Sequence, residues 1–407
     1  MEIRFLNREV SDLCLGKPAL RPIPATATVA EALSLLKRSG ETHVSVWICN
    51  HSSSPRKVLE ISADTDDSID ECRCVGKISM VDVICFLCKQ ESLIDSSKAL
   101  EVPIWKILPK GDSIVRHLEH NSSLLEAIDY MLEGIQNLVI PIHNYTSTNS
   151  RRKPLRKSSS LRSTHHNGVE YCWLTQEDVA RFLLNAIGVF SPMPMFSIES
   201  LDIIDRDIMT VRYHDPAISA LDSITLANIE QTAVAVVDNN SRLIGEISAS
   251  TLAYCDEDVA AAITTLSAGD LMAYIDCGGP PEDLVGLVKM RLQEEKLGVM
   301  MELMDEEFSV SSSSSASSCS SDDESGLSRY RSGRYSFARR SEAITCYPGS
   351  SLVAVLIQAL AHRANSVWVI DEDHNLVGAV TLKGILKVFR SNANARRIPE
   401  MENLSTQ

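Results

Sequence analysis

One pattern of apolar residues occurs four times along the chain. In each copy, apolar residues at positions i, i+3, i+4 and i+7 predict an amphipathic helix, because that spacing places them on one helical face. Such repetition indicates a chain built from similar structural units. The four sets are Val29, Ala32, Leu33 and Leu36; Leu124, Ala127, Ile128 and Met131; Ala217, Ala220, Leu221 and Ile224; and Leu352, Val355, Leu356 and Ala359.

Polar residues predict where these helices begin. Serine, threonine and aspartate side chains accept hydrogen bonds from the free amides of a first helical turn, and a glutamate three residues later completes a capping box. Proline is favoured at the first helical position. The predicted caps are Thr28 with Glu31, Ser123 with Glu126, Asp215 before Pro216, and Ser350 or Ser351.

Two strand-like runs and a second helix follow each of these helices. The runs are rich in valine, isoleucine, tryptophan and tyrosine, which favour β-strands. The repeated unit is therefore a short strand, a helix, two strands and a second helix. The predicted strand pairs are 43–48 with 74–79, 138–143 with 171–175, 233–238 with 243–248, and 366–371 with 376–381.

Three inserts interrupt these units. The first holds six acidic residues within 60–71, and the second holds six Lys or Arg and no acid within 151–166. The third, at about 277–341, begins with a predicted helix (280–307) and continues into a serine-rich segment, 309–340, that we expect to be disordered because it has little apolar surface to bury. Serines in the last two inserts are candidates for regulatory phosphorylation. The four units are predicted to span 11–95, 96–192, 198–267 and 268–392.

The charge and composition of the chain limit the classes of partner. Its 54 acidic and 39 basic residues give a net charge of −15, which argues against binding nucleic acid through bulk charge and against docking on an anionic membrane. The longest apolar stretch, 182–198, contains Asn185, Pro192 and Pro194 and is too broken to span a membrane. Acidic residues near the N-terminus argue against a targeting peptide, so the expected location is the cytoplasm, with the nucleus as the alternative.

The last strand of each unit ends at a small polar residue that opens the second helix. The segments are 76–82 (GKISMVD), 172–178 (CWLTQED), 245–251 (GEISAST) and 378–384 (GAVTLKG). In this unit of strands and helices, the pattern Gly-x-Ile/Val-Ser/Thr-x-x-Asp resembles the cystathionine-β-synthase (CBS) domain, and four copies resemble the plant CBS-domain-only proteins with four repeats. The resemblance implies an α+β fold in which four CBS repeats of order β-α-β-β-α pair as two Bateman modules, packed as a disc or as a homodimer.

The resemblance also implies a class of ligand. In that family, the clefts of a Bateman module often hold AMP, ADP, ATP or S-adenosylmethionine, with the motif Ser or Thr on a phosphate and the Asp on the ribose hydroxyls. The second module should bind more weakly, because Thr251 and Gly384 stand in place of the acid. The candidate ligand-binding residues are Ser79, Asp82, Thr175 and Asp178, with Ser248 and Thr381 as the weaker ones.

A second interpretation of the same motif needs no ligand. Ser/Thr-x-x-Asp also has the spacing of a helix capping box, which fixes the start of a helix by itself. The later units open the same helix without the acid, so the acid is not obligatory for the cap. From the sequence, both interpretations remain open.

No pattern typical of an active site or a metal centre stands out. The sequence contains no G-x-S-x-G, P-loop or H-E-x-x-H pattern. Cys72, Cys74, Cys85 and Cys88 have a spacing that invites zinc, but one falls in a strand and two in an apolar helix. We therefore expect buried thiols, no metal and no catalysis.

These observations together predict a non-enzymatic regulatory protein that binds an adenosyl ligand and modulates a partner protein. The family resemblance suggests a thioredoxin-type protein or a protein kinase complex as the partner. One alternative is a ligand-free scaffold for protein–protein interaction. Another is a subunit resembling the gamma subunit of AMP-activated protein kinase, which would need cationic residues such as Arg116, His117 and Lys77 in its clefts.

Overall fold

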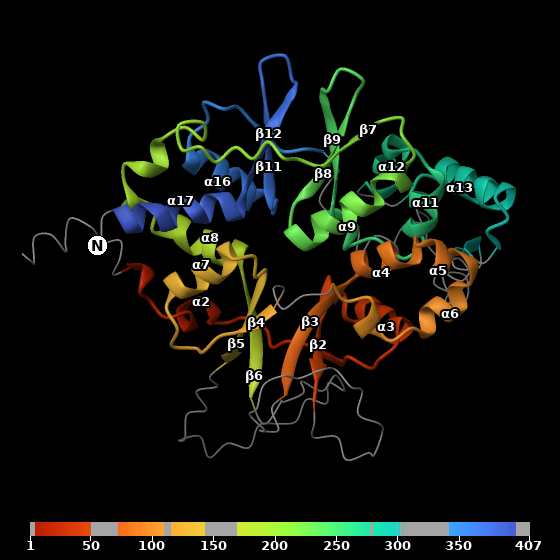
Figure 1. Cartoon of the computed structure of the whole chain (residues 1–407), viewed down its shortest axis with the longest axis horizontal. Helices are drawn as coiled ribbons and strands as arrows, with labels where there is room; N and C mark the ends of the chain where they lie inside the picture. The colour runs from red at the N-terminus through yellow and green to blue at the C-terminus, as the bar shows by residue number, and fades with distance from the viewer. Residues whose placement is uncertain are drawn as a thin grey trace, which may run out of the picture.

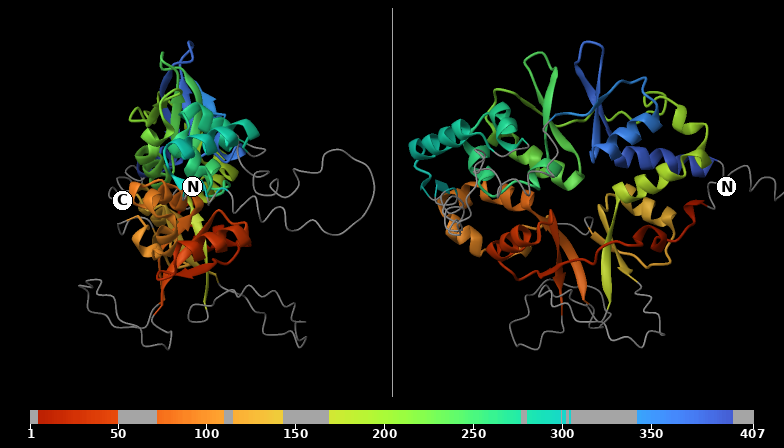
Figure 2. Two further views of the ribbon diagram at one scale, coloured as in Figure 1. Left: turned by 90° about the vertical axis from the view of Figure 1, so that its right-hand side faces the viewer. Right: turned by 180° about the vertical axis from the view of Figure 1, so that it is seen from behind.

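The described part of the chain forms four three-stranded sheets with a belt of helices between them (Figure 1). Turned by 90°, the described elements form a narrower body than in the broad view (Figure 2), as in a disc. The acidic insert, the basic insert and the serine-rich segment lie outside the described residues. The computed structural model describes residues 5–49, 72–109, 115–142, 169–276, 280–298, 300–301, 304 and 342–395.

Each sheet belongs to one repeat, and all four have the same topology. The middle strand pairs in parallel with the short first strand and antiparallel with the third. The strand pairs predicted from the sequence are confirmed to within one residue at each end. The sheets are β1 (Pro22–Pro24), β2 (His43–Ile48) and β3 (Arg73–Ser79); β4 (Val115–His117), β5 (Asn137–Ile142) and β6 (Glu170–Thr175); β7 (Thr210–Arg212), β8 (Ala233–Val237) and β9 (Leu243–Ser248); and β10 (Thr345–Cys346), β11 (Ser366–Ile370) and β12 (Leu376–Thr381).

The amphipathic helices lie where the periodicity predicts them. Of the residues predicted for their apolar faces, all are buried except Leu221, which is partly buried. The first helices of the repeats are α3 (Val29–Ser39), α7 (Leu124–Leu132), η4 (Ala217–Ala220) continuing into α9 (Leu221–Glu230), and α16 (Leu352–Ala361). The helices that follow the third strands are α4 (Met80–Leu87), α8 (Gln176–Asn185), α10 (Ala249–Leu252) and α17 (Leu382–Ala395).

Three of the four predicted caps are confirmed. Thr28 and Glu31 form both hydrogen bonds of a capping box at α3. The hydroxyls of Ser123 and Ser351 accept hydrogen bonds from backbone amides in the first turns of α7 and α16, at 3.1 and 3.4 Å. Polar residues before an apolar period therefore identified these helix starts correctly.

The cap predicted at Asp215 is wrong. The helical segment of the third repeat begins with the 3-10 turn η4, whose preceding residue is Pro216, and no side chain caps it. Pro216 forms an isolated antiparallel bridge with Ser267, and the carbonyl of Asp215 accepts a hydrogen bond from the amide of Ala268 at 2.9 Å. The capping residues of the other three repeats form the same kind of bridge, so Pro216 occupies the capping position itself, and a proline side chain has no atom that can accept a hydrogen bond.

The sheets pack face to face in two pairs. Trp47 and Cys74 of the first sheet lie in one buried cluster with Val139 and Trp173 of the second. In the other pair, residues of β8 and β9 lie in one cluster with Trp368 and other residues of the fourth sheet. The predicted fold class is confirmed: the chain is α+β, with four repeats paired as two modules.

The helices of one module cover the helices of the other. α4 of the first repeat packs on α9 and α11 (Val259–Thr265) of the third, and α17 of the fourth repeat packs on α7 and α8 of the second. Continuous clusters of buried apolar residues cross both contacts. Two ion pairs at 2.6 Å cross the same boundary, between Lys37 and Glu257 and between Arg390 and Asp129.

The segment that precedes a repeat lies on the neighbouring repeat, an arrangement that the sequence analysis did not predict. The short helix α2 (Ser11–Cys14) packs on β5, β6 and α8 of the second repeat. The segment with α6 (Ser96–Glu101) and η1 (Ile104–Lys106) packs on the first repeat, where the amide of Ile104 donates to the carbonyl of Ala27 at 2.8 Å. The domain boundaries stated above follow chain order and stay a prediction.

The remaining helices connect the repeats. α13 lies within the helix predicted for the third insert, and its Val288 and Leu292 are fully buried. Among the described residues, no helix is both long and apolar enough to cross a membrane. These connecting helices are α5 (Gln90–Ile94), η2 (Ile187–Phe190), η3 (Met193–Met195), α12 (Ala268–Ile275) and α13 (Glu282–Glu294).

The linker between the modules extends the edge of the fourth sheet. Asp205 and Ala379 exchange both of their backbone hydrogen bonds, each at 2.8 Å. The neighbouring Gly378 allows this approach, since a Cβ at that position would collide with the carbonyl oxygen of Asp205 and would lie 2.7 Å from Cγ2 of Ile204. The position therefore requires a residue without a side chain.

Gly378→Ala should destabilise the chain by about 2–3 kcal/mol, because the backbone of the linker has to move to admit the methyl group. Gly349→Ala is the matched control, since a Cβ there would meet nothing within 4 Å. Urea unfolding of both variants tests this prediction. Equal midpoints for the two variants would contradict the close packing of the linker on β12.

Candidate functional site

The two acidic motifs of the first module lie on sheet faces that meet each other. Residues directly opposite in an antiparallel pair point to the same face. His43 is opposite Ser79 in the first sheet, and Asn137 is opposite Thr175 in the second. The ring of Trp173, on the second sheet, has its centroid 6.2 Å from that of His43 on the first. The motifs of both repeats therefore adjoin one interface.

The first motif forms a capping box at the start of α4. The amide and hydroxyl of Ser79 donate to Oδ2 of Asp82 at 2.7 and 2.6 Å, and the amide of Asp82 donates to Oγ of Ser79 at 3.3 Å. The other carboxylate oxygen, Oδ1, accepts from Nδ2 of Asn228 at 2.8 Å. Because Asn228 lies on α9 of the third repeat, this motif is hydrogen-bonded to the other module.

A lysine and a histidine lie beside the first motif. Lys77 precedes Ser79 by two residues on β3, so the two side chains share a face. Burial lowers the pKa of Lys77 and raises the pKa of Asp82, and the attraction between their charges opposes both shifts. Burial and then the charge of Lys77 lower the pKa of His43 to about 3. His43 is therefore neutral at pH 7, and Lys77 is the basic side chain beside the first motif.

The second motif also forms a capping box, and a lysine from the N-terminal segment pairs with it. The amide and hydroxyl of Thr175 donate to Oδ2 of Asp178 at 2.8 and 2.7 Å. Lys17 forms an ion pair with the same carboxylate and donates to the carbonyl of Trp173 at 2.7 Å. The sequence analysis missed Lys17, because no local pattern links it to a motif so distant in the chain.

Asn137 buries a hydrogen-bond donor that has no partner among the described residues. Only 1% of the residue is exposed, and its Nδ2 atom makes no hydrogen bond there. Leaving a buried amide unpaired costs about 1–3 kcal/mol, so such a group in a native fold needs a water or ligand to explain it. An alignment of the four units could have found this position, which is the first residue of each middle strand: His43, Asn137, Ala233 and Ser366.

The motifs of the second module keep the cap and lack the acid. The hydroxyl of Ser248 accepts from the amide of Thr251 at 3.2 Å, and the two hydroxyl oxygens lie 2.9 Å apart. The hydroxyl of Thr381 accepts from the amide of Gly384 at 3.0 Å. Thr251 is fully buried, so a hydroxyl replaces the carboxylate inside the protein. The ligand role of Ser248 and Thr381 stays a prediction.

The capping-box interpretation is confirmed for both acidic motifs, since each makes the two reciprocal bonds. The capping hydrogen bonds do not involve all of the polar groups at this interface. Two carboxylates, two hydroxyls, the lysines Lys17 and Lys77 and the unpaired amide of Asn137 adjoin one interface. Such a set suits a ligand that carries both hydroxyls and an anionic group. The ligand role of Ser79, Asp82, Thr175 and Asp178 stays a prediction.

The four cysteines with zinc-like spacing lie in two different clusters. Cys72 and Cys74 lie between the sheets of the first module. Cys85 and Cys88 lie among the helices, and burial raises the pKa of both thiols. In the described part of the chain, no group of three or more His, Cys, Asp or Glu residues could hold a metal ion.

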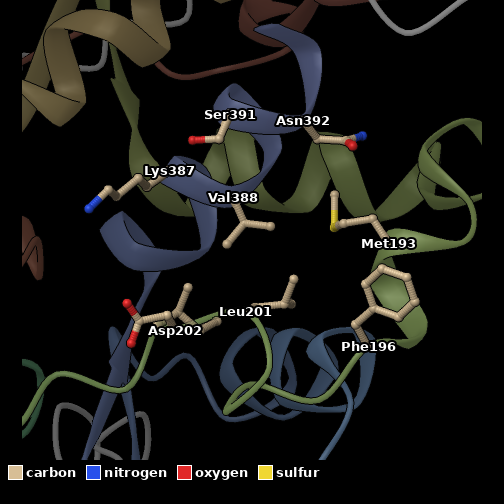
Figure 3. A pocket seen from close by; sticks show the side chains of 9 residues that line it. Met193, Phe196, Leu201, Asp202, Lys387, Val388, Ser391 and Asn392 are labelled. Atoms are coloured by element: carbon tan, nitrogen blue, oxygen red, sulfur yellow. The ribbon is translucent and has the colours of Figure 1, made fainter. Parts of the chain in front are cut away.

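A cavity of about 350 Å³ lies away from the motifs, between α17 and the connection that leads out of the second repeat (Figure 3). Lys387, Val388, Ser391 and Asn392 enter it from α17, and Asp202 faces them from the connection. Its wall contains no residue of the four motifs. The cavity therefore adds no residue to the candidate site.

Comparison with known proteins agrees with this architecture. The family model of the CBS domain matches residues 338–391. The Arabidopsis thaliana "CBS domain-containing protein CBSX5" is 45% identical over 404 residues, which cover 96% of this chain and 98% of that protein. The chain belongs to the family of CBS-domain-containing proteins. A second Arabidopsis CBS-domain protein, "CBSX6", is 28% identical over 422 residues, covering 96% of this chain and 95% of its own.

The fold also has a counterpart among solved structures. A Methanocaldococcus jannaschii protein, described as a candidate archaeal homolog of g-AMPK, superposes with a TM-score of 0.52 at 16% identity. The match covers 94% of this chain and 99% of that one. The overall fold of this chain is therefore similar to that of the archaeal protein.

His43 should make the chain lose stability in mild acid. Below about pH 6.5 the unfolded chain takes up a proton on His43, whereas the folded chain, with a His43 pKa of about 3, does not. Stability therefore falls as the pH decreases through this window, by about 1–2 kcal/mol between pH 6.5 and 5.

His43→Gln should remove this part of the acid sensitivity, measured by urea unfolding at pH 6.5 and 5. The same substitution at His214, which is exposed, is the matched control and should leave the pH dependence unchanged. An unchanged pH dependence in His43→Gln would show that His43 is protonated in the folded chain.

Proposed function

We propose that this CBS-domain protein is a non-enzymatic regulator whose first module binds an adenosyl ligand, namely AMP, ADP, ATP or S-adenosylmethionine, and modulates a partner protein. The observation that carries the proposal is the unpaired, buried amide of Asn137 beside the second motif. A relative with 45% identity is itself described by its CBS domains alone, which agrees with a regulatory role.

Each part of the ligand has a chemical counterpart in the site. A carboxylate can accept two hydroxyl donors at once, so Asp82 or Asp178 suits the ribose. Lys77 and the amino-terminal end of α4 favour an anionic group such as a phosphate. Nδ2 of Asn137 offers a donor to an acceptor atom of the ligand. In the second module no carboxylate stands at the motif position, so ribose binding there should be weaker by at least about tenfold.

A ligand-free scaffold is the second candidate, and one observation favours it. Both motif carboxylates already have partners within the chain, since Asp82 accepts from Asn228 and Asp178 pairs with Lys17. A ligand has to displace these contacts, which lowers its apparent affinity. Under this alternative the module surfaces alone would recruit the partner.

A kinase-associated role is the third candidate. The Arabidopsis "SNF1-related protein kinase regulatory subunit gamma-like PV42b" is 20% identical over 409 residues, covering 95% of this chain and 96% of its own. Two of the cations that this role would use have contacts elsewhere: Arg116 lies over the ring of Tyr130 at 4.1 Å, and His117 accepts from the amide of Cys74 at 3.0 Å. Co-purification of a kinase catalytic subunit would favour this candidate over the other two.

An adenosyl ligand should raise the unfolding midpoint of the chain. At 100 times its dissociation constant, a ligand adds about 2.7 kcal/mol to the free energy of unfolding. Thermal unfolding with AMP, ADP, ATP and S-adenosylmethionine measures this for the wild type and for the double variant Asp82→Ala with Asp178→Ala. The double variant should lose the ligand-dependent shift.

Asp270→Ala is the matched control for this experiment. Ser267 and Asp270 have the same spacing and a similar cap at the start of α12, away from the sheet interfaces. Asp270→Ala should lower stability through the lost cap and keep the full ligand-dependent shift. No shift with any ligand at millimolar concentration would support the scaffold instead.

Asn137→Leu should reduce ligand binding without reducing the stability of the chain. Leucine has the same heavy-atom branching as asparagine and no donor. Because an unpaired buried amide is removed, the free energy of unfolding should stay the same or rise by up to about 1–3 kcal/mol, measured by urea unfolding. The ligand-dependent shift should fall at the same time. A wild-type ligand response in Asn137→Leu would show that Asn137 does not contact the ligand.

A further inference from the structure

Two cysteine thiols meet where the N-terminal segment lies on the second repeat. Cys14 is the last residue of α2 and Cys172 lies in β6; both are free thiols, with 7% and 0% of their surfaces exposed. The two residues belong to one buried cluster where α2 packs on β6, and each side chain shifts the pKa of the other. A disulfide requires two sulfurs that can approach with little movement of the backbone. Two neighbouring thiols on two packed elements, in one buried cluster, are suited to this bond.

The same segment carries the lysine that pairs with the second motif. The amide of Lys17 donates to the carbonyl of Cys14 at 3.2 Å, so the cysteine and the lysine belong to one turn. Three residues later the amide of Leu20 donates to the carbonyl of Tyr171 at 2.8 Å. The chain around Lys17 is thus held against β6 on both sides, at Cys14 and at Leu20. Fixing Cys14 to β6 would therefore also fix Lys17 over Asp178.

We propose that Cys14 and Cys172 are a redox-active thiol pair, which a small-molecule disulfide such as oxidised glutathione converts into an intramolecular disulfide that fastens Lys17 over the carboxylate of Asp178. Oxidation would then reduce access of the ligand to the second motif. This last consequence rests on the proposed function, whereas the disulfide and the fastening of the segment do not.

Cys14 is the sulfur that attacks the oxidant. Interaction with the side chain of Cys172, aided by the charge of Lys17, lowers the pKa of Cys14, and the same interaction together with burial raises the pKa of Cys172. The thiolate of Cys14 bonds to one sulfur of oxidised glutathione, and the other glutathione leaves as a thiolate. Cys172 then loses its proton and attacks the sulfur of Cys14, which releases the second glutathione. Two protein thiols are oxidised and one glutathione disulfide is reduced to two thiols.

Opening of the N-terminal segment gives the oxidant access. α2 has only four residues, and such short elements open locally at a lower free energy than the core of a fold. A second thiol contact exists in this module, between Cys49 and Cys72 where β2 and β3 leave the sheet. Its sulfurs lie away from Lys17, so a disulfide there would not fix the second motif. The experiment therefore has to identify which cysteines are joined.

The test exposes the full chain to oxidised glutathione, blocks the remaining thiols and maps disulfides by mass spectrometry without reduction. The wild type should give a peptide joined through Cys14 and Cys172. Cys172→Ala should stop at a mixed disulfide of glutathione on Cys14, and Cys14→Ala should leave Cys172 reduced. Cys346→Ala removes a buried thiol of the second module and is the matched control, with the wild-type pattern expected.

Hydrogen exchange provides a readout that needs no ligand. The amides of Lys17 and Leu20 should exchange at least about tenfold more slowly in the oxidised chain, and reduction with dithiothreitol should restore the faster rate. Absence of the Cys14–Cys172 peptide, a disulfide found only at Cys49–Cys72, or unchanged exchange in a chain that carries the disulfide would each overturn the proposal.

Ligand binding is measured separately in the Asp82→Ala background, where the second motif keeps its acid. Oxidation should weaken binding of the adenosyl ligand by about tenfold, within the range usual for coupled sites. Equal affinity of the reduced and oxidised chains would overturn the effect on the ligand. Absence of binding to the reduced wild type would count against the proposed function, and the mapping and exchange results would still decide the disulfide.

Discussion

Every sheet in this protein has to be covered on both faces, and this requirement determines the arrangement of the rest. Alternate residues of β2 point to opposite faces: Val44 and Val46 lie in the helical core, and Trp47 lies between the sheets after a local irregularity of register. One repeat supplies helices for only one of these faces. A second sheet covers the other face, which produces the pair of repeats within a module. The helices in turn have an apolar outer side, as the burial of Ile84 and Leu87 in α4 shows, and the second module covers it.

This double coverage explains why the two acidic motifs are unequal although their capping geometry is the same. α4 lies in the middle of the contact between modules, so its Asp82 meets Asn228 of the other module. α8 starts beside the N-terminal segment, so its Asp178 meets Lys17. The proposed ligand at the first motif would alter a contact between modules, and at the second motif it would alter the attachment of the segment before the first repeat. A ligand at each motif would therefore affect a different part of the molecule. The free energy by which it shifts a conformational equilibrium cannot exceed the difference between its binding free energies for the two conformations.

The features that could be predicted from the sequence are those determined by residues close together in the chain. Helical periodicity placed the apolar faces of the first helices correctly, and enrichment in valine, isoleucine, tryptophan and tyrosine placed the strands to within one residue, because these signals depend on neighbours in the chain. The candidate motifs are confirmed as caps for the same reason, whereas their ligand role remains a prediction. Asp215 failed as a cap because the helical segment starts one residue later than expected, so that Pro216, which has no side-chain acceptor, occupies the capping position. Lys17 and Asn228 were not found, because each contacts its carboxylate across a repeat boundary that only the folded chain creates.

The second module keeps the fold of the first but differs from it at the interface between the sheets. At the position of Lys77, the third repeat has Glu246, which is almost completely buried and accepts a hydrogen bond from the indole of Trp368 at 2.6 Å. A lysine at this position would attract an anionic group, whereas a glutamate would not. The indole donor meanwhile satisfies the buried oxygen and joins the two sheets. The same interface position therefore carries a basic side chain in the first module and a structural hydrogen bond in the second, which is why the proposed ligand is placed in the first module.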